Sequence, residues 1–240
     1  MAHKKWYRRG LYYIKRGKGK IPIVGRVDFG NLRRVEPFNR TFGFDRGHPV
    51  DRYYIENFLT DYAIDIYGRV LEIGDDQYTH QFGKERVTVS DVLDINPDNS
   101  VANLKVDLTR ADILKSNCFD CIIFTQTLQY IYDLPAAIMT LHRILKPGGV
   151  LLGTFPGISQ ISRYDMNLWG EFWRFTDASI RQLFGGIFGF NNVSVQTYGN
   201  ILAAVSFLYG LVSDDLTVKE LDINDPDYQV LITVRAAKGY

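Results

Sequence analysis

The chain of 240 residues is 46% hydrophobic and 23% charged, which is typical of a globular protein with a core and excludes a disordered or collagen-like chain. Its two cysteines are too few for a disulfide framework. The most apolar stretch, residues 201–212, is too short to span a bilayer, and no apolar segment follows the basic start. We therefore expect a cytoplasmic protein without a secretory signal.

The net charge of +1 hides an uneven distribution along the chain. Residues 1–52 hold fourteen Lys and Arg against four Asp and Glu, whereas the rest of the chain holds fourteen against twenty-three. A basic arm on an acidic body favours an anionic partner, such as nucleic acid, a membrane surface or a phosphorylated substrate. The alternative is an arm that packs across the acidic body of its own or a neighbouring chain, and the sequence leaves both open.

The N-terminal part of the chain predicts irregular structure followed by one helix. Residues 1–45 show no sustained period of 3.6 or 2. A helix is predicted from Asp51, as N-cap after Pro49, to Gly68. Its apolar residues recur at helical spacing, at Ile55, Phe58, Leu59, Tyr62 and Ile66.

Beyond Gly68, short apolar runs alternate with helical segments. The predicted strands are residues 70–73, 87–90, 101–106, 121–124, 150–154, 193–197 and 228–235. Helices are predicted after a cap at Asp133, after Thr176 or Asp177, and around residues 201–212, while residues 146–149 predict a turn. Near-continuous apolar strands separated by helices indicate an α/β domain with a parallel sheet covered on both faces.

Residues suited to ligand binding stand at the predicted ends of four successive strands. They are Glu72 and Gly74, then Asp91, then Asp107, then Thr125 and Gln126. Ligands of such sheets bind beyond the carboxyl ends of the strands, and an acid after the second strand can accept hydrogen bonds from a ribose diol. Taken singly, Asp91 and Asp107 are more often turn caps. Taken together, these residues favour a nucleoside-containing ligand.

Three motifs carry a family resemblance: Val-Leu-Glu-Ile-Gly at 70–74, Phe-Asp-Cys-Ile-Ile at 119–123 and Leu-Lys-Pro-Gly-Gly-Val-Leu-Leu at 145–152. They resemble the class I S-adenosylmethionine-dependent methyltransferases (methyltransferase type 11), over roughly residues 69–155. The resemblance implies a Rossmann-like, seven-stranded, mostly parallel sheet with helices on both faces. It would occupy residues 51–240, with insertions around 157–178 and 200–225, behind a basic N-terminal extension at residues 1–50.

The resemblance also implies S-adenosylmethionine as cofactor, with S-adenosylhomocysteine as product. It assigns Glu72 and Gly74 to the methionine part, Asp91 to the ribose with Asp94 in reserve, Asp107 and Leu108 to the adenine, and Thr125 and Gln126 to the methyl group. Asp76 and Tyr78 stand where the family usually has further glycines. Because glycine permits close backbone approach, we expect a wider turn here, with both side chains near the cofactor.

Segments outside this core resemble bacterial methyltransferases associated with sugar and polysaccharide biosynthesis. They are residues 45–55, 125–130 and 169–176. The candidate general bases are His48, Asp51 and Tyr130, followed by Asp165 and Glu171. The candidate acceptor-binding residues are Arg46, Arg52, Tyr53, Trp169, Trp173 and Arg174, the arginines for an anion and the tryptophans as an aromatic platform. The alternatives are a backbone-bonded loop position for His48, ion pairs with the acidic body for the arginines, and core packing for the aromatic residues.

The resulting hypothesis is a methyltransferase that acts on an oxygen of a small sugar, glycan, phosphorylated or natural-product acceptor, without a metal site. One alternative is an RNA-directed enzyme, because the basic arm interleaves Lys and Arg with Trp6, Tyr7, Tyr12 and Tyr13. We favour a small acceptor over nucleic acid. A second alternative is a methyltransferase-like binding or scaffold protein without turnover, suggested by Asp76 and Tyr78. The sequence does not give the oligomeric state.

Overall fold

The structure is a computed structural model that describes residue 22 and residues 24–240. The chain divides into two compact units, Met1–Glu36 and Pro37–Tyr240. The described residues of the first unit form one short 3-10 turn, Gly30–Leu32, which agrees with the predicted irregular structure. The basic and aromatic residues at positions 4–20 lie outside the described residues, so the basic arm and its RNA-binding role stay predictions.

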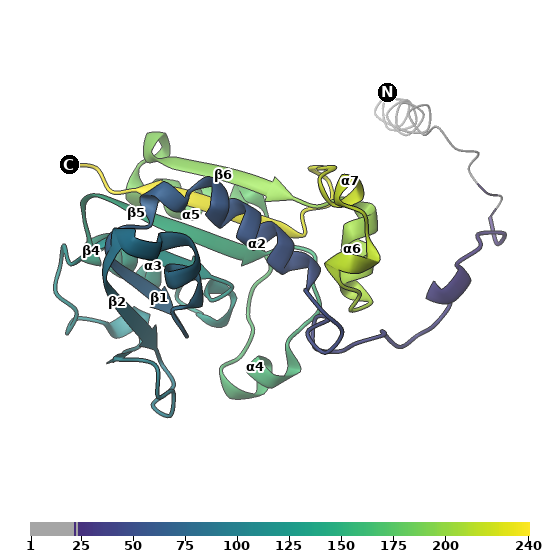
Figure 1. Cartoon of the computed structure of the whole chain (residues 1–240), viewed down its shortest axis with the longest axis horizontal. Helices are drawn as coiled ribbons and strands as arrows, with labels where there is room; N and C mark the ends of the chain where they lie inside the picture. The colour runs from purple at the N-terminus through teal and green to yellow at the C-terminus, as the bar shows by residue number, and fades with distance from the viewer. Residues whose placement is uncertain (1–21, 23) are drawn as a thin grey trace, which may run out of the picture. The chain divides into compact units, whose positions relative to one another are not determined.

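The second unit is built on a seven-stranded sheet with the strand order β3-β2-β1-β4-β5-β7-β6 (Figure 1). The strands are β1 (Gly68–Ile73), β2 (Val87–Asp94), β3 (Leu104–Lys105), β4 (Phe119–Thr125), β5 (Leu145–Pro156), β6 (Val193–Tyr198) and β7 (Leu231–Ala237). Strands β1 to β5 pair in parallel, and β7 runs antiparallel between β5 and β6. The predicted Rossmann-like, mostly parallel sheet is confirmed.

Helices cover both faces of this sheet, because successive strand side chains point to opposite sides. On one face, α3 (Leu134–Ile144) and α5 (Asp177–Phe188) pack against a core that includes Leu71, Ile122 and Leu151. On the other face, α2 (Val50–Asp61) and α6 (Ile201–Leu208) pack against the neighbouring strand positions, Val70, Ile123 and Leu152. Two shorter helices, α4 (Arg163–Leu168) and α7 (Val218–Leu221), lie in the connections.

Local capping signals identify two helix starts correctly and misplace one. Asp133 caps α3 by accepting a hydrogen bond from the backbone of Ala136, and Thr176 caps α5. The N-cap of α2 is Pro49 rather than Asp51, which is buried in the first helical turn.

The predicted end of α2 at Gly68 is also wrong, because the helix stops at Asp61. A 3-10 turn, Ala63–Asp65, follows the helix and brings the Asp65 carboxylate to Arg235 of β7, at 2.7 Å. Gly68 opens β1 instead, with φ +66°. The helix thus ends early, just before the point where Asp65 pairs with Arg235 of β7. The spacing of residues along the sequence does not reveal such a distant partner.

Strand β2 extends through Asp91 to Asp94, so the predicted strand end at Asp91 is wrong. Asp91 sits within the strand, opposite Leu71 of β1. Its carboxylate accepts hydrogen bonds from Arg69 Nε at 2.6 Å and Asn103 Nδ2 at 2.8 Å, and these partners let a charged residue remain buried in a strand.

Two other boundaries differ from the sequence prediction. Strand β3 is confined to Leu104–Lys105, and β5 already begins at Leu145, so residues 146–149 belong to a strand rather than a free turn. There the backbone N–H of Gly148 donates to the carbonyl of Lys238, so pairing with the chain after β7 extends the sheet. Within the described part of the chain, no helix is long and apolar enough to cross a membrane.

Candidate active site

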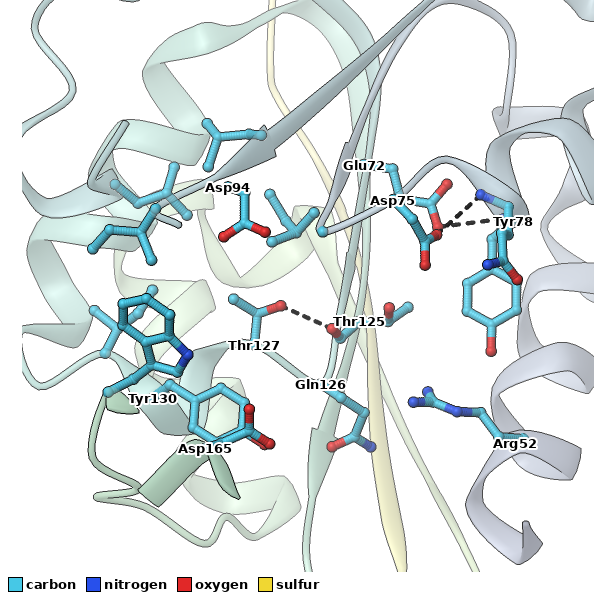
Figure 2. A pocket seen from close by; sticks show the side chains of 18 of the residues that line it. Arg52, Glu72, Asp75, Tyr78, Asp94, Thr125, Gln126, Thr127, Tyr130 and Asp165 are labelled. Atoms are coloured by element: carbon cyan, nitrogen blue, oxygen red, sulfur yellow. Dashed lines mark hydrogen bonds between the residues drawn. The ribbon is translucent and has the colours of Figure 1, made fainter. Parts of the chain in front are cut away.

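A cavity of about 730 Å³ opens at the carboxyl ends of β1, β2 and β4 (Figure 2). Strand β1 has β2 on one side and β4 on the other, so the chain order of the strands reverses at this position. Ligands of open α/β sheets bind at such a reversal. Figure 2 shows the Glu72–Tyr78 turn on one side of the opening and Tyr130 with Asp165 across from it.

The turn after β1 is held in shape by the buried carboxylate of Glu72. Both oxygens accept hydrogen bonds from the turn: one from the backbone of Tyr78 at 3.3 Å, the other from the backbone and hydroxyl of Thr79, each at 2.7 Å. Burial raises the pKa of Glu72 to about 7, although the Thr79 donors act against this shift. Glu72 lines the cavity as predicted, and its hydrogen-bonding capacity is directed to the turn.

Gly74 presents open backbone to the cavity. Its φ is +86°, in the left-handed region, and no atom lies within 4 Å of the position that a Cβ would occupy. A ligand can therefore approach this backbone closely, as the sequence predicts. The next residue, Asp75, also lines the cavity, although the sequence interpretation passed over it.

The two residues that replace the usual glycines have different positions. Tyr78 lines the cavity, and burial raises its pKa to about 12. Asp76 does not line the cavity: it accepts hydrogen bonds from the Ser90 hydroxyl, at 3.1 Å, and lies 2.9 Å from the His80 ring. The structure therefore does not support the prediction that Asp76 contacts the cofactor, because the side chain is engaged by β2 and by the following turn.

The acid at the end of β2 is Asp94, which lines the cavity. Its carboxylate is oriented by the backbone of Asn96, at 2.9 Å, and by the side-chain amide of Asn99, at 2.7 Å. The same amide donates to the carbonyl of Gly74 at 2.7 Å and so ties Asp94 to the β1 turn. Asp91 lies three residues before this strand end and is not among the residues that line the cavity. Asp94 therefore occupies the strand-end position that was expected for Asp91 from the sequence.

The remaining predicted cofactor residues all line the cavity. Asp107 and Leu108 follow β3, where the Asp107 carboxylate also caps a 3-10 turn by accepting from the backbone of Thr109 at 2.8 Å. Thr125 is the last residue of β4, and Gln126 follows it. Gln126 has φ +46°, a strained value for a residue with a side chain, and such strain is concentrated at functional sites.

Several acceptor-side candidates meet at the same cavity. His48, Arg52, Tyr130 and Trp169 line it, together with Asp165 of α4. The Tyr130 hydroxyl donates to Asp165 at 3.1 Å, and burial, followed by the charge of Asp165, raises the pKa of Tyr130 well above its usual range. Tyr130 therefore remains protonated near neutral pH.

Four candidate acceptor residues lie outside the cavity lining, because other parts of the chain engage them. Arg46 pairs with Asp215 at 3.1 Å, and Arg174 pairs with Glu171 at 2.7 Å, as the ion-pair alternative expected. The Tyr53 hydroxyl donates to Asp222 at 2.7 Å, and the Trp173 indole donates to the carbonyl of Ile131 at 3.0 Å. The structure therefore places these four residues in contacts within the chain and not in the lining of this cavity.

Asp51 and Glu171 line a smaller cavity of about 300 Å³ beside the first. Gln129, which the sequence interpretation missed, lines it as well. Its signal is weak, since a glutamine after a buried strand is most often at the surface. Burial raises the pKa of Asp51, and the Arg52 charge opposes this shift. Among the described residues, no three His, Cys, Asp or Glu side chains gather to hold a metal ion.

A comparison with protein families matches residues 56–153 to the family described as "Methyltransferase domain". This stretch, less than half of the chain, is similar to that family. The match contains β1, the Glu72–Gly74 turn, Asp94 and the end of β4, which together form one side of the cavity. It supports an S-adenosylmethionine-dependent methyltransferase, in agreement with the family resemblance in the sequence.

Solved structures share the fold at low sequence identity. A methyltransferase of Archaeoglobus fulgidus described as SAM-dependent has a TM-score of 0.53 and 14% identity, over 78% of this chain and 94% of that one. A candidate sarcosine dimethylglycine methyltransferase of Galdieria sulphuraria has a TM-score of 0.53 and 14% identity, over 80% and 91%. The N-methyltransferase NodS of Bradyrhizobium japonicum, in complex with S-adenosylhomocysteine, has a TM-score of 0.50 and 14% identity, over 81% and 90%.

One curated protein shares a short segment with this chain. A mitochondrial arginine hydroxylase of Danio rerio is 40% identical over 43 residues, which is 18% of this chain and 13% of that protein. The chain therefore spans about an eighth of the length of this relative.

Proposed function

We propose that the larger cavity binds S-adenosylmethionine and that the chain transfers its methyl group to an acceptor oxygen. The open backbone at Gly74 would receive the methionine part, and Asp94, in place of Asp91, would accept hydrogen bonds from the ribose hydroxyls. Asp107 and Leu108 would face the adenine, and Gln126 would stand nearest the methyl group. The observation that carries the proposal is the hydrogen-bonded unit of Gly74, Asn99 and Asp94 at the strand ends.

When bound, the cofactor would supply a methyl group on a positively charged sulfur. The acceptor oxygen would form a bond to this methyl carbon as the carbon–sulfur bond breaks, with its electron pair kept by sulfur. The proton of the acceptor hydroxyl would pass to a base. The chain must position the acceptor and accept this proton. Tyr130 is a poor base, because its raised pKa keeps it protonated. His48 and Asp51 are the better candidates for the base. His48 lines the larger cavity, and Asp51 lines the smaller cavity beside it.

The acceptor is proposed to be a small sugar, glycan, phosphorylated metabolite or natural product, methylated on oxygen. The sugar and polysaccharide association rests on the resemblance of the three segments around residues 45–55, 125–130 and 169–176. Trp169 and Arg52 support it, since both line the cavity and could contact a sugar ring and an anionic group respectively. A binding protein without turnover remains the competing hypothesis, because Tyr78 lines the cavity where the family usually has glycine.

The proposal is tested by calorimetric titration of the full chain with S-adenosylmethionine and S-adenosylhomocysteine. We expect binding that Asp94→Ala weakens at least tenfold, because two hydrogen bonds to the ribose are lost. Asp98→Ala, which changes an exposed acid four residues later, should leave the affinity unchanged. If neither ligand binds the wild-type chain, the proposal is wrong, and equal losses in both variants would remove the assigned role of Asp94.

A further inference from the structure

The smaller cavity joins the larger one. Five residues line both: Phe44, Arg52, Gln126, Tyr130 and Asp165. A ligand group in the smaller cavity would therefore lie next to the residues that follow β4, where the proposed function places the methyl group. With a volume of about 300 Å³, the smaller cavity is large enough for one small ring.

Two buried acceptor atoms in this cavity have no hydrogen-bond partner. They are Oδ1 of Asp51, whose residue is 8% exposed, and Oε1 of Gln129, whose residue is 2% exposed. The Gln129 amide nitrogen donates to the carbonyl of Gln126 at 2.9 Å, which fixes the orientation of this side chain. Buried polar atoms in folded proteins are nearly always paired, so two unpaired acceptors in one cavity indicate a missing donor.

The other acids of the cavity already have partners. Glu171 accepts from the backbone of Ser162, at 2.8 Å, and pairs with Arg174 at 2.7 Å. Asp165 accepts from the Ser162 hydroxyl at 2.5 Å and from Tyr130 at 3.1 Å. The unpaired buried atoms of the cavity are therefore hydrogen-bond acceptors beside carboxylates, which disfavour an anionic group and attract a donor. The Arg52 guanidinium also lines the cavity, but the charge of the adjacent Asp51 opposes its attraction for an anion.

The rest of the lining is mixed: it contains the polar residues Arg52, Gln126 and Ser159 together with apolar side chains. Phe42, Phe207 and Val230 are among the apolar ones. Phe42 and Phe207 stack with ring centroids 5.9 Å apart. Apolar side chains in the same lining as two unpaired acceptors fit a group that has both C–H surface and several donors.

We propose that the smaller cavity is the acceptor subsite, and that it takes a hydroxyl- or amine-bearing group without negative charge, bound through Asp51 and Gln129. This inference rests on the proposed function for its location and narrows the acceptor by excluding a phosphate or carboxylate at this position. The neighbouring Arg52 guanidinium, 5.6 Å from the centre of the Phe44 ring, lies at the junction of the two cavities.

The test is saturation-transfer NMR on the full chain with S-adenosylhomocysteine present. The probes are a panel of neutral hexoses, the matching amino sugars and the matching hexose phosphates. We expect transfer to hexoses or amino sugars and none to the phosphates. The hexose and amino-sugar arms distinguish a hydroxyl from an amine as the bound donor.

Variants connect the signal to the two unpaired acceptors. Asp51→Asn, which removes the charge, and Gln129→Met, which removes the acceptor, should each reduce the transfer at least threefold. Asp61→Asn changes an exposed aspartate at the other end of α2 and serves as the matched control. Circular dichroism verifies that each variant is folded, and either informative variant suffices if the other fails to fold.

Three results would overturn the inference: preferential binding of the phosphates, transfer unchanged in both informative variants, or no transfer to any hexose or amino sugar. Calorimetry with S-adenosylhomocysteine separates this inference from the proposed function. We expect its affinity to be unchanged in Asp51→Asn and Gln129→Met. If the wild-type chain does not bind S-adenosylhomocysteine, the proposed function is wrong. If it binds S-adenosylhomocysteine but no sugar gives a saturation-transfer signal, only the acceptor subsite is wrong.

Discussion

Replacing Glu72 with Gln should change the way in which stability depends on pH. Burial raises the pKa of Glu72 from 4.5 to about 7, so the folded chain retains a proton that the unfolded chain releases. The stabilisation from this proton is complete below pH 4.5 and is lost as the pH rises through 7. Between these values the free energy of unfolding should fall by about 3 kcal/mol, at about 1.4 kcal/mol per pH unit.

Gln carries no charge and resembles the protonated acid in shape. The Glu72→Gln variant should therefore lack this slope, with a constant offset from altered hydrogen bonds to Thr79. Its stability relative to wild type should rise by about 3 kcal/mol between pH 4.5 and 8. Urea unfolding followed by circular dichroism at pH 4.5, 5.5, 6.5, 7.5 and 8 measures both curves.

The control is Glu85→Gln, which removes an exposed carboxylate from the 3-10 turn before β2. It should leave the slope between pH 4.5 and 7 as in the wild type. Parallel stability curves for wild type and Glu72→Gln over the whole range would refute the reasoning, because they would mean that Glu72 is charged in the folded chain at all these values.

The remaining predictions concern two glycine positions and the ion pair between Asp91 of β2 and Arg69 of β1. Gly68→Ala should destabilise the chain by about 2 kcal/mol or more, since φ is +66° and a Cβ would lie 2.4 Å from the Asp120 carboxylate. Gly74→Ala meets open space, so it should cost only about 1 kcal/mol in urea unfolding while weakening S-adenosylhomocysteine binding. Asp91→Ala should lower the free energy of unfolding by about 1 to 2 kcal/mol, because Asn103 and Arg69 lose their acceptor while Arg69, 41% exposed, stays partly solvated, yet change calorimetric ligand affinity less than twofold. A tenfold loss of affinity there would contradict its assignment to the strand interior.

The fold could be predicted because its signals are local. An apolar run such as residues 121–124 of β4 predicts a buried strand from its own residues, because no polar side chain interrupts it. Asp133 and Thr176 cap helices through hydrogen bonds to residues three positions later, which a sequence displays directly. The Glu72–Gly74 turn stands at the end of a predicted strand, and its role came from the resemblance of residues 70–74 to the methyltransferase family.

The site was predicted less well, because its geometry depends on partners far along the chain. Arg69 and Asn103 decide that Asp91 is buried within β2, and this moves the strand end to Asp94. Ser90 draws Asp76 away from the cavity. Each of these positions depends on a hydrogen bond between residues that lie 12 or more positions apart in the chain. The local pattern of the sequence does not predict such a partner.

The sequence by itself therefore determined the sheet, its covering helices and the turn that faces the cavity, because hydrophobic period and capping act over a few residues. Only the tertiary structure decided which acid stands at the cavity and which acceptors are left unpaired. The open oxygens of Asp51 and Gln129 are identified by what surrounds them, and that depends on the packing of α2 and of the loop after β4. Whether a side-chain oxygen is buried without a hydrogen-bond partner can be known only from the folded structure.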